Sequence, residues 1–579
     1  MSSFQYQRRK SSVISVGNTP MGGDNPIRIQ SMTNTSTMDT AGSIRQCIRI
    51  IEAGGEYVRL TAQGLREAEN LRAIQKGLRD WGYQTPLVAD IHFNPKAAEA
   101  AAQIVEKVRI NPGNFADPNK TFQTFEYSDE EYRQEVEKIR ERFAPFLAIC
   151  KKHRTAIRIG VNHGSLSDRI MSRYGDTPQG MVESCMEFLR ICVSENFMDV
   201  VISMKASNTF TMVQAVRLLV EQMEQEGMYF PLHLGVTEAG EGEDGRIKSA
   251  VGIGTLLLEG IGDTIRVSLS EDPEAEIPVA RLLVDYVTYA RRSVYATSNL
   301  EDKAGALFLA RRRLEPTPSG SNSASSAFKR PFETVPLVLS DRSQTADDST
   351  EADLVPDYFY TGSLTLGDLS FLPLSFPELT DKEIEHLKLN PQTIILLHAE
   401  DNNVYEQKEC IFVLRNNLIT NRIVLWNTYD ESDLETFQIK AATDCGSFFL
   451  DRLADGLMLS NRNPQLRPQA LDACSFGILQ AAGRRISKTE YISCPGCGRT
   501  LFDLQSVIKK VKMATSHLKG LKIAIMGCIV NGPGEMADAD YGYVGAGAGK
   551  VSLYKGRECV LKNIPEEKAV DELLRLINR

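Results

Sequence analysis

The chain has no long apolar segment. Among its 579 residues, no apolar run approaches the roughly 20 residues that a helix needs to span a bilayer. Its first residues, Met1 to Ser12, are polar and basic and contain no apolar signal core. We therefore expect no membrane association and a cytoplasmic location.

An excess of basic residues is also missing. The chain has 66 Lys and Arg against 75 Asp and Glu, well mixed along the sequence, and its formal net charge is −9. This balance argues against nonspecific binding to nucleic acid. At this length roughly two to four domains are expected, which fits a multidomain enzyme better than a small binding module.

The first half of the chain alternates short β-branched runs with longer stretches of helical apolar spacing, which is typical of a parallel α/β fold. Eight runs are expected as strands: residues 27–33, 57–61, 86–93, 107–111, 156–162, 200–207, 231–238 and 264–270. Eight strands with crossover helices in about 250 residues predict a (β/α)8 TIM-type barrel. We assign this barrel to residues 1–295.

Past Arg313 the composition changes. Residues 315–326 are rich in Ser and Pro and residues 340–351 are again polar, so we expect a flexible linker over residues 296–355. Residues 356–485 return to a mixed α/β pattern without a motif that carries chemistry, and we interpret them as an inserted domain with a structural role. Residues 486–579 are expected to form a small C-terminal α/β domain.

Polar side chains recur on one face of the expected strands. Residues two apart on a strand share a face, and this parity aligns a set of cations: Arg28, Arg59, Arg109, Arg158, Lys205 and Arg266. The same face carries Asp90, His92, Asn111, Asn162, Glu238 and Ser268. Burying such a cationic excess would cost several kcal/mol per ion unless an anionic ligand offset it.

The barrel mouth is therefore predicted to bind a small, strongly anionic substrate such as a diphosphate, which Arg contacts through forked hydrogen bonds. The alternative is that each Arg pairs with an acid on a neighbouring helix, such as Glu52 or Glu56.

Three cysteines and a glutamate form a metal-binding pattern near the C-terminus. Cys494 and Cys497 flank a Pro-Gly turn, and Cys528 precedes a Gly-Pro-Gly loop that ends at Glu535. One reading is a redox-active iron–sulfur cluster in which the oxygen ligand Glu535 is exchangeable. The other is a closed structural zinc site, for which Cys559 would supply the fourth thiolate. The loop beside Cys528 favours Glu535.

The chain resembles the 4-hydroxy-3-methylbut-2-enyl diphosphate synthase family. The matching blocks are Ile29-Gln-Ser-Met-Thr-Asn-Thr35, Leu87-Val-Ala-Asp-Ile-His-Phe93, Val108-Arg-Ile-Asn-Pro-Gly-Asn114, Ile157-Arg-Ile-Gly-Val-Asn162, Lys205-Ala-Ser-Asn208, Gly235-Val-Thr-Glu-Ala-Gly240, Ser493-Cys-Pro-Gly-Cys-Gly-Arg499 and Gly527-Cys-Ile-Val-Asn-Gly-Pro-Gly-Glu535. The resemblance implies a barrel that binds 2-C-methyl-D-erythritol 2,4-cyclodiphosphate. It also implies a 4Fe-4S cluster held by three Cys and one Glu.

The resemblance implies a reductive ring opening with loss of water, which yields an allylic diphosphate. Asn111 and Asn162 are expected to orient the diphosphate, and the residues expected to hold it are Arg59, Arg109, Arg158, Lys205, Arg266 and Ser268. Glu238 is the candidate for proton transfer to the leaving oxygen, with Asp90 and His92 in support. Because no nucleotide-binding fingerprint is evident, we expect flavodoxin or ferredoxin as the electron donor.

The chain departs from the two-domain form of this family, because it carries the middle region and so resembles the larger three-domain form. In the short form, the cluster domain caps the barrel of a dimer partner. The long insertion would let the cluster domain close on its own barrel instead, and a homodimer is compatible with either arrangement. The rival reading of the whole chain is a zinc-stabilised, phosphate-binding regulatory or scaffold protein without redox activity.

Overall fold

The computed structural model describes residues 6–115, 127–290, 335–343, 354–500, 502–529, 534, 536 and 538–578. Its contacts divide the chain into two compact units, of which one joins Arg8–Val284 to Ile486–Arg579 and the other is built mainly from Asp285–Arg485. Among the helices of these described residues, none combines the length and the apolar character needed to cross a membrane.

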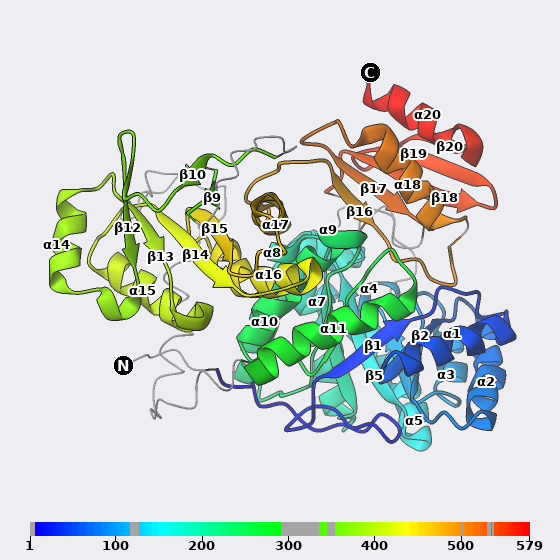
Figure 1. Ribbon diagram of the computed structural model, residues 1–579. Coiled ribbons are helices and arrows are strands. Elements are labelled where there is room, and N and C mark those ends of the chain that lie inside the picture. The colour runs from blue at the N-terminus through cyan, green and yellow to red at the C-terminus, as the bar shows by residue number, and fades with distance from the viewer. Residues whose placement is uncertain are drawn as a thin grey trace. The chain divides into compact units, whose positions relative to one another are not determined.

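The first part of the larger unit is a parallel β-barrel (Figure 1). Its strands are β1 (Arg28–Met32), β2 (Tyr57–Thr61), β3 (Leu87–Asp90), β4 (Lys107–Ile110), β5 (Ala156–Asn162), β6 (Val200–Lys205), β7 (His233–Leu234) and β8 (Thr264–Ile265). They pair in the order β6-β5-β4-β3-β2-β1-β8-β7, and every pair is parallel. A parallel bridge between Ile202 and Leu232 links the two edges of the sheet. The predicted TIM-type barrel is therefore confirmed.

Helices follow the strands and cover the outside of the barrel. They are α1 (Thr40–Glu52), α2 (Leu65–Asp80), α3 (Pro95–Ala101), α4 (Pro112–Phe115), α5 (Asp129–His153), α6 (Asp168–Tyr174), α7 (Pro178–Ser194), α8 (Thr209–Gln225), α9 (Gly242–Ser249), α10 (Thr255–Leu258) and α11 (Glu276–Asp285). Several begin where a polar side chain accepts a hydrogen bond from a free backbone N–H of the first turn, as Asp39, Asn94, Ser167 and Asn208 do.

The end of the barrel where the strands begin is closed by apolar residues. An antiparallel bridge between Ile14 and Met21 folds the N-terminal segment into a hairpin. This hairpin packs on inward-facing residues from the starts of four strands, namely Tyr57, Val88, Ala156 and Val201. The apolar plug leaves the opposite end, where the strands finish, as the open mouth.

The smaller unit contains a second, seven-stranded sheet in the order β10-β9-β15-β14-β13-β12-β11. Its strands are β9 (Leu337–Asp341), β10 (Tyr358–Tyr360), β11 (Thr365–Leu366), β12 (Leu369–Leu374), β13 (Ile394–Leu397), β14 (Ile423–Tyr429) and β15 (Gly456–Asn461). Its helices include α14 (Asp381–Leu389), α15 (Val404–Asn416), α16 (Leu434–Leu450) and α17 (Pro468–Ala481). Strand β9 lies within the expected linker 296–355, whereas the Ser- and Pro-rich residues 315–326 lie outside the described residues.

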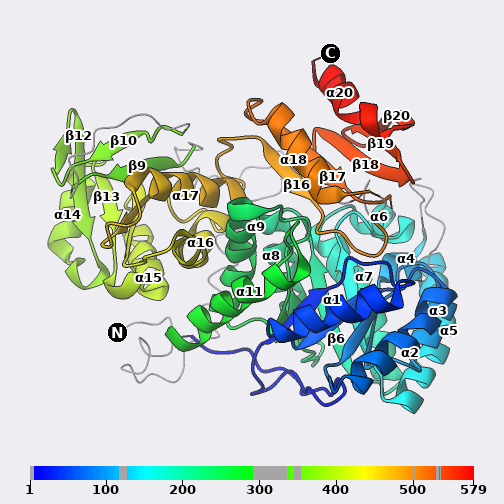
Figure 2. The same cartoon turned by 45° about the vertical axis from the view of Figure 1, so that its right-hand side comes forward.

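The C-terminal domain is a five-stranded sheet of β16 (Glu490–Ser493), β17 (Lys522–Met526), β18 (Tyr541–Gly547), β19 (Lys550–Lys555) and β20 (Glu558–Pro565). Helices α18 (Leu504–Thr515) and α20 (Glu566–Ile577) cover one face of it (Figure 2). Apolar residues of both helices, such as Ile508 and Leu573, pack on Ile525 and Leu553 of the sheet. This packing fixes the end of β16, where the first cysteines follow.

Candidate functional site

A pocket of about 750 Å³, part of it open to solvent, lies at the mouth of the barrel beneath the C-terminal domain. Its barrel residues include Met32, Arg59, Asp90, His92, Arg109, Arg158, Asn162, Lys205, Glu238, Arg266 and Ser268. The C-terminal domain contributes Cys494, Cys497, Arg499 and Cys528. Most of the residues expected from the sequence therefore meet in one place.

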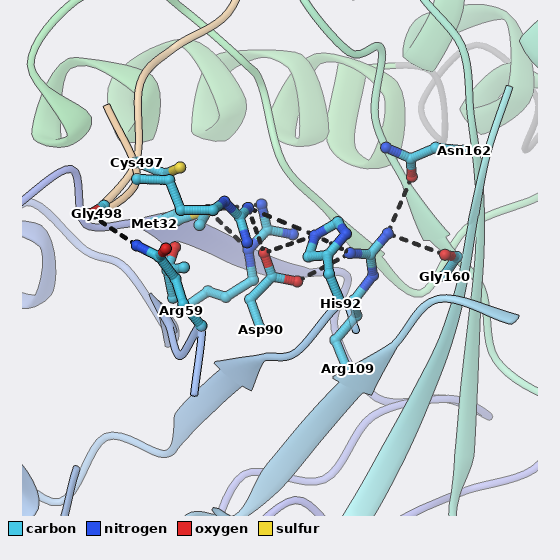
Figure 3. Close-up of polar contacts among 12 residues, drawn as sticks. Met32, Arg59, Asp90, His92, Arg109, Gly160, Asn162, Cys497 and Gly498 are labelled. Carbon is cyan, nitrogen blue, oxygen red and sulfur yellow. Dashed lines mark hydrogen bonds and ion pairs between the residues drawn. The ribbon is translucent and has the colours of Figure 1, made fainter. Parts of the chain in front are cut away.

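Arg109 organises a buried network on the floor of the pocket (Figure 3). Its guanidinium lies 3.1 Å from Asp90 Oδ1 and 2.6 Å from His92 Nε2, and it donates to Gly160 O at 2.9 Å and to Asn162 Oδ1 at 3.1 Å. Because an arginine can only donate, Nε2 of His92 is the acceptor in this contact.

The electrostatic states of Asp90 and His92 follow from this network. Burial alone would raise the pKa of Asp90, but the nearby guanidinium groups of Arg109 and Arg59 hold it well below its usual value. Burial, together with Arg109 and Arg499, lowers the pKa of His92 to about 3. Near neutral pH the carboxylate is therefore charged, and the imidazole is a neutral hydrogen-bond acceptor.

Cations outnumber acids around the pocket, which six cationic side chains and two carboxylates line. Arg158 is 1% exposed, and among the described residues its Nε and Nη1 atoms have no hydrogen-bond partner. Burial, reinforced by Arg59 and Arg158, holds the pKa of Lys205 well below its usual value. Burying positive charge without equal counter-charge is costly, so this arrangement favours an anionic ligand.

Two of the cations expected in the pocket form ion pairs with acidic side chains. Arg28 forms a 2.7 Å ion pair with Glu56 and does not line the pocket among the described residues. Arg266 lines it but also makes a forked contact with Glu276 of α11, at 2.9 and 2.8 Å. The alternative of pairing with acids is thus right for Arg28 and holds in part for Arg266.

Asn111 is buried but is not among the described residues that line the pocket. Its amide donates to Ser165 Oγ at 2.9 Å, and its Oδ1 accepts from the backbone N–H of Gly113 at 3.2 Å. Its contacts hold together two loops at the barrel mouth.

Glu238 lies on a constrained loop that touches the C-terminal domain. Its backbone has a φ of 50°, in the left-handed region that a non-glycine residue adopts at some cost. The next residue, Ala239, forms a parallel bridge with Ser493. Ser270 reinforces this junction, because its Oγ donates to Cys494 O at 3.0 Å and its N–H donates to Gly240 O at 2.9 Å.

The three cysteines expected as metal ligands all line the pocket. Cys494 Sγ accepts from the backbone N–H of Gly527 at 3.2 Å, a contact that stabilises a thiolate ligand. Burial and the neighbouring Glu238 raise the pKa of the Cys494 thiol to about 12. A hydrogen bond with Cys528 lowers the pKa of Cys497 well below its usual value.

This donor set fits a cofactor bound by soft thiolate ligands. Cys559, the fourth ligand of the zinc alternative, lies on β20 opposite Tyr554, and its thiol donates to Leu561 O rather than lining the pocket with the other three. Glu535 lies outside the described residues. Among those described, no three His, Cys, Asp or Glu side chains are arranged to hold a single metal ion.

Ion pairs tie the C-terminal domain to the barrel of the same chain. They include Lys488–Asp244 at 2.5 Å, Lys512–Glu241 at 2.9 Å, Glu490–Lys248 at 2.9 Å, Arg557–Asp176 at 3.2 Å and Arg499–Asp90 at 3.3 Å. Gly164 and Gly534 approach so closely that a Cβ on Gly164 would lie 2.3 Å from Gly534 O. The thiols are therefore brought to the pocket within one chain.

The sequence alone did not predict a role in the site for Met32, Arg499, Glu276 or Ser270. Only Arg499 had a usable signal, since a cation two residues after Cys497 can stabilise a thiolate. Glu276 and Ser270 act through contacts that only the folded chain creates.

The fold and the pocket define a class of protein: a TIM-barrel enzyme whose cationic mouth binds an anionic substrate and is covered by a domain that carries three cysteines. We call this C-terminal domain, residues 486–579, the cap. Two known protein families match separate parts of the chain. The family described as the GcpE TIM-barrel domain matches residues 11–281, and the GcpE protein C-terminal domain matches residues 490–579. Neither reaches the middle region.

Full-length relatives include the middle region. The chain is 55% identical to the 4-hydroxy-3-methylbut-2-en-1-yl diphosphate synthase (flavodoxin) of Phocaeicola vulgatus, with 100% of this chain and 98% of that protein covered. It is 57% identical to that of Parabacteroides distasonis (100% and 99%) and 42% identical to that of Leptospira interrogans (99% and 97%). The chain belongs to the 4-hydroxy-3-methylbut-2-en-1-yl diphosphate synthase family.

Proposed function

We propose how this chain performs the activity of its family. The chain is an oxidoreductase that forms 4-hydroxy-3-methylbut-2-enyl diphosphate in the methylerythritol phosphate route to isoprenoid precursors. Its substrate in this proposal is 2-C-methyl-D-erythritol 2,4-cyclodiphosphate, which takes up two electrons and one proton, opens its ring and releases water. The observation that carries the proposal is the meeting of a cationic barrel mouth with three thiols in one pocket.

The cyclic diphosphate binds where the cations gather. Arg59, Arg109, Arg158, Lys205, Arg266 and Ser268 provide the ligands for its phosphate oxygens. Asn162, which also accepts a hydrogen bond from Arg109, orients the diphosphate. Asn111 acts indirectly, because its contacts hold the loops that form the mouth. Substrate charge then offsets the cost of burying these cations.

Cys494, Cys497 and Cys528 would hold a 4Fe-4S cluster, with Glu535 as its fourth and exchangeable ligand. When bound, such a cluster supplies electrons and a Lewis-acidic iron beside the substrate. The backbone N–H of Gly527 and the guanidinium of Arg499 stabilise the negative charge of the thiolates. Flavodoxin, for which the relatives are named, is the proposed electron donor, and ferredoxin is the alternative.

Glu238 delivers the proton to the leaving hydroxyl oxygen, which departs as water. Its carboxyl lies at the junction between the barrel and the cysteine loop, where the Ala239–Ser493 bridge fixes its backbone. His92 remains neutral and Asp90 charged, so this pair positions Arg109 and the substrate rather than supplying the proton.

The test is to purify the chain without oxygen and to measure its iron, sulfide and zinc. The cyclodiphosphate is then added with reduced flavodoxin, and the allylic product is quantified. Brown protein that forms the product supports the proposal. Colourless protein with stoichiometric zinc and no product would contradict it and favour the regulatory alternative.

A further inference from the structure

The C-terminal domain places a charged side chain inside the barrel pocket. Arg499 follows Cys497 by two residues, and its guanidinium lies 3.3 Å from Asp90 Oδ2 and 3.5 Å from His92 Nε2. Its side chain is 9% exposed, although it comes from a different domain. Among the described residues, its buried Nε atom has no hydrogen-bond partner.

The other ion pairs that join the two domains involve described residues that do not line the pocket. Arg557, for example, pairs with Asp176 at 3.2 Å, but its side chain is 64% exposed and does not line the pocket among the described residues. Pairs exposed to this degree contribute little to binding or stability, because water screens them. Arg499 is buried against a carboxylate that Arg109 already contacts at 3.1 Å.

Asp90 is therefore shared between two guanidinium groups, Arg109 from the barrel and Arg499 from the cap. Asp90 alone cannot neutralise both guanidinium groups. Although Arg499 also interacts with the Cys497 thiol, it brings the cationic side chains that line the pocket to six against two carboxylates. Such an addition is unfavourable for an empty site and favourable for a site that binds a highly charged anion. The planar group also carries a buried Nε–H without a partner among the described residues, a donor that suits a phosphate oxygen.

We propose that Arg499 is a substrate ligand supplied by the C-terminal domain, so that the diphosphate site is complete only when this domain covers the barrel. The inference rests on the proposed function, because it assigns the added charge to the cyclic diphosphate. It follows that substrate binding and the covering of the barrel stabilise each other. The other cross-domain ion pairs position the cap without contacting substrate.

The test compares Arg499→Gln with the matched Arg557→Gln, since each removes one cross-domain ion pair. Binding of 2-C-methyl-D-erythritol 2,4-cyclodiphosphate to the oxidised holoenzyme is measured by calorimetry without reductant, so that no turnover occurs. Arg499→Gln is expected to raise Kd about 10- to 100-fold, as for loss of a charge-assisted hydrogen bond. Arg557→Gln should leave Kd within about twofold of the unmodified chain.

Iron content and the electron paramagnetic resonance spectrum of the substrate-free, reduced protein are recorded for each variant. If Arg499→Gln loses iron, Arg499→Lys provides the comparison, because it keeps the charge but lacks the fork and should bind more weakly than the unmodified chain. Equal Kd values for the unmodified chain and the Arg499 variant that retains iron would overturn the inference. Failure of the unmodified chain to bind the compound would instead contradict the proposed function.

Discussion

The barrel mouth and the middle domain both bury charged groups, but the two regions differ in whether these groups are paired with an opposite charge. At the mouth, Arg158 is buried with two guanidinium nitrogens that have no partner among the described residues. In the middle sheet, Arg342 likewise has an Nε and an Nη1 without a partner among the described residues, but its Nη2 lies 3.2 Å from buried Asp472, which also accepts from Ser340 Oγ at 2.8 Å. Buried Asp444 likewise accepts hydrogen bonds from Tyr286 and Tyr429.

This difference separates a binding site from a structural core. Charges that satisfy one another within the fold stabilise it and leave little affinity for a ligand. Charges that lack enough counter-charge lower stability, and they are retained where a ligand supplies the missing charge. The comparison supports a catalytic barrel mouth and a structural middle domain.

The largest effect is expected at the thiols. Cys494→Ser, Cys497→Ser and Cys528→Ser should each abolish or severely deplete the cluster and the activity, because a serine hydroxyl is a poor ligand for iron. Cys559→Ser should retain both, since its thiol contacts Leu561 O on β20. Iron and sulfide analysis measures the outcome. Loss of iron from the Cys559 variant would mean that the fourth ligand has been wrongly assigned.

The next largest effect is expected for a buried arginine of the barrel mouth, and a buried arginine of the middle domain serves as its control. Arg158→Gln should lower kcat/KM about 30- to 1000-fold, or ~2 to 4 kcal/mol, without loss of iron. Its thermal stability without substrate should be unchanged or higher, because an uncompensated charge has been removed.

Arg342→Gln should show the reverse pattern, with normal kcat/KM and lower stability, because Asp472 loses its ion-pair partner. Steady-state kinetics and thermal unfolding distinguish the two variants. Normal kinetics for Arg158→Gln would show that the buried cations of the mouth do not bind substrate.

A smaller effect concerns the pH dependence of stability in the middle domain. Burial raises the pKa of Asp472 from its ordinary 3.8 to about 6, so the folded state holds this proton more tightly than the unfolded state. Stability from this group is therefore present below about pH 4 and is lost as the pH rises through 6. Between pH 5 and 7.5 the loss should be roughly 1 kcal/mol, and Asp472→Asn should remove it.

Hydrogen exchange of peptides from β14 and β15 reports this stability in the unmodified chain and in the variant. Activity should not change in Asp472→Asn. An identical pH dependence in both proteins would show that Asp472 titrates normally in the folded chain.

The sequence predicted which strands form more accurately than it predicted where they end or which distant residues they contact. All eight expected runs became barrel strands because β-branched residues and strand parity are local signals, but β7 and β8 keep only two residues each. Strand β9 was missed because its short apolar run lies in polar surroundings. Arg499 could not be placed beside Asp90, since 409 positions separate them and only the packing of the cap brings them together.

The central claim is that the barrel and the cysteine domain of one chain form one complete site. Mixing an inactive Glu238→Gln protein with an inactive Cys528→Ser protein tests it most directly, because closure between chains would pair an intact barrel with an intact cysteine domain. The exchange of subunits is first verified by mass spectrometry of the intact assembly. We predict that the mixture stays as inactive as its components, whereas substantial restored activity would contradict the claim.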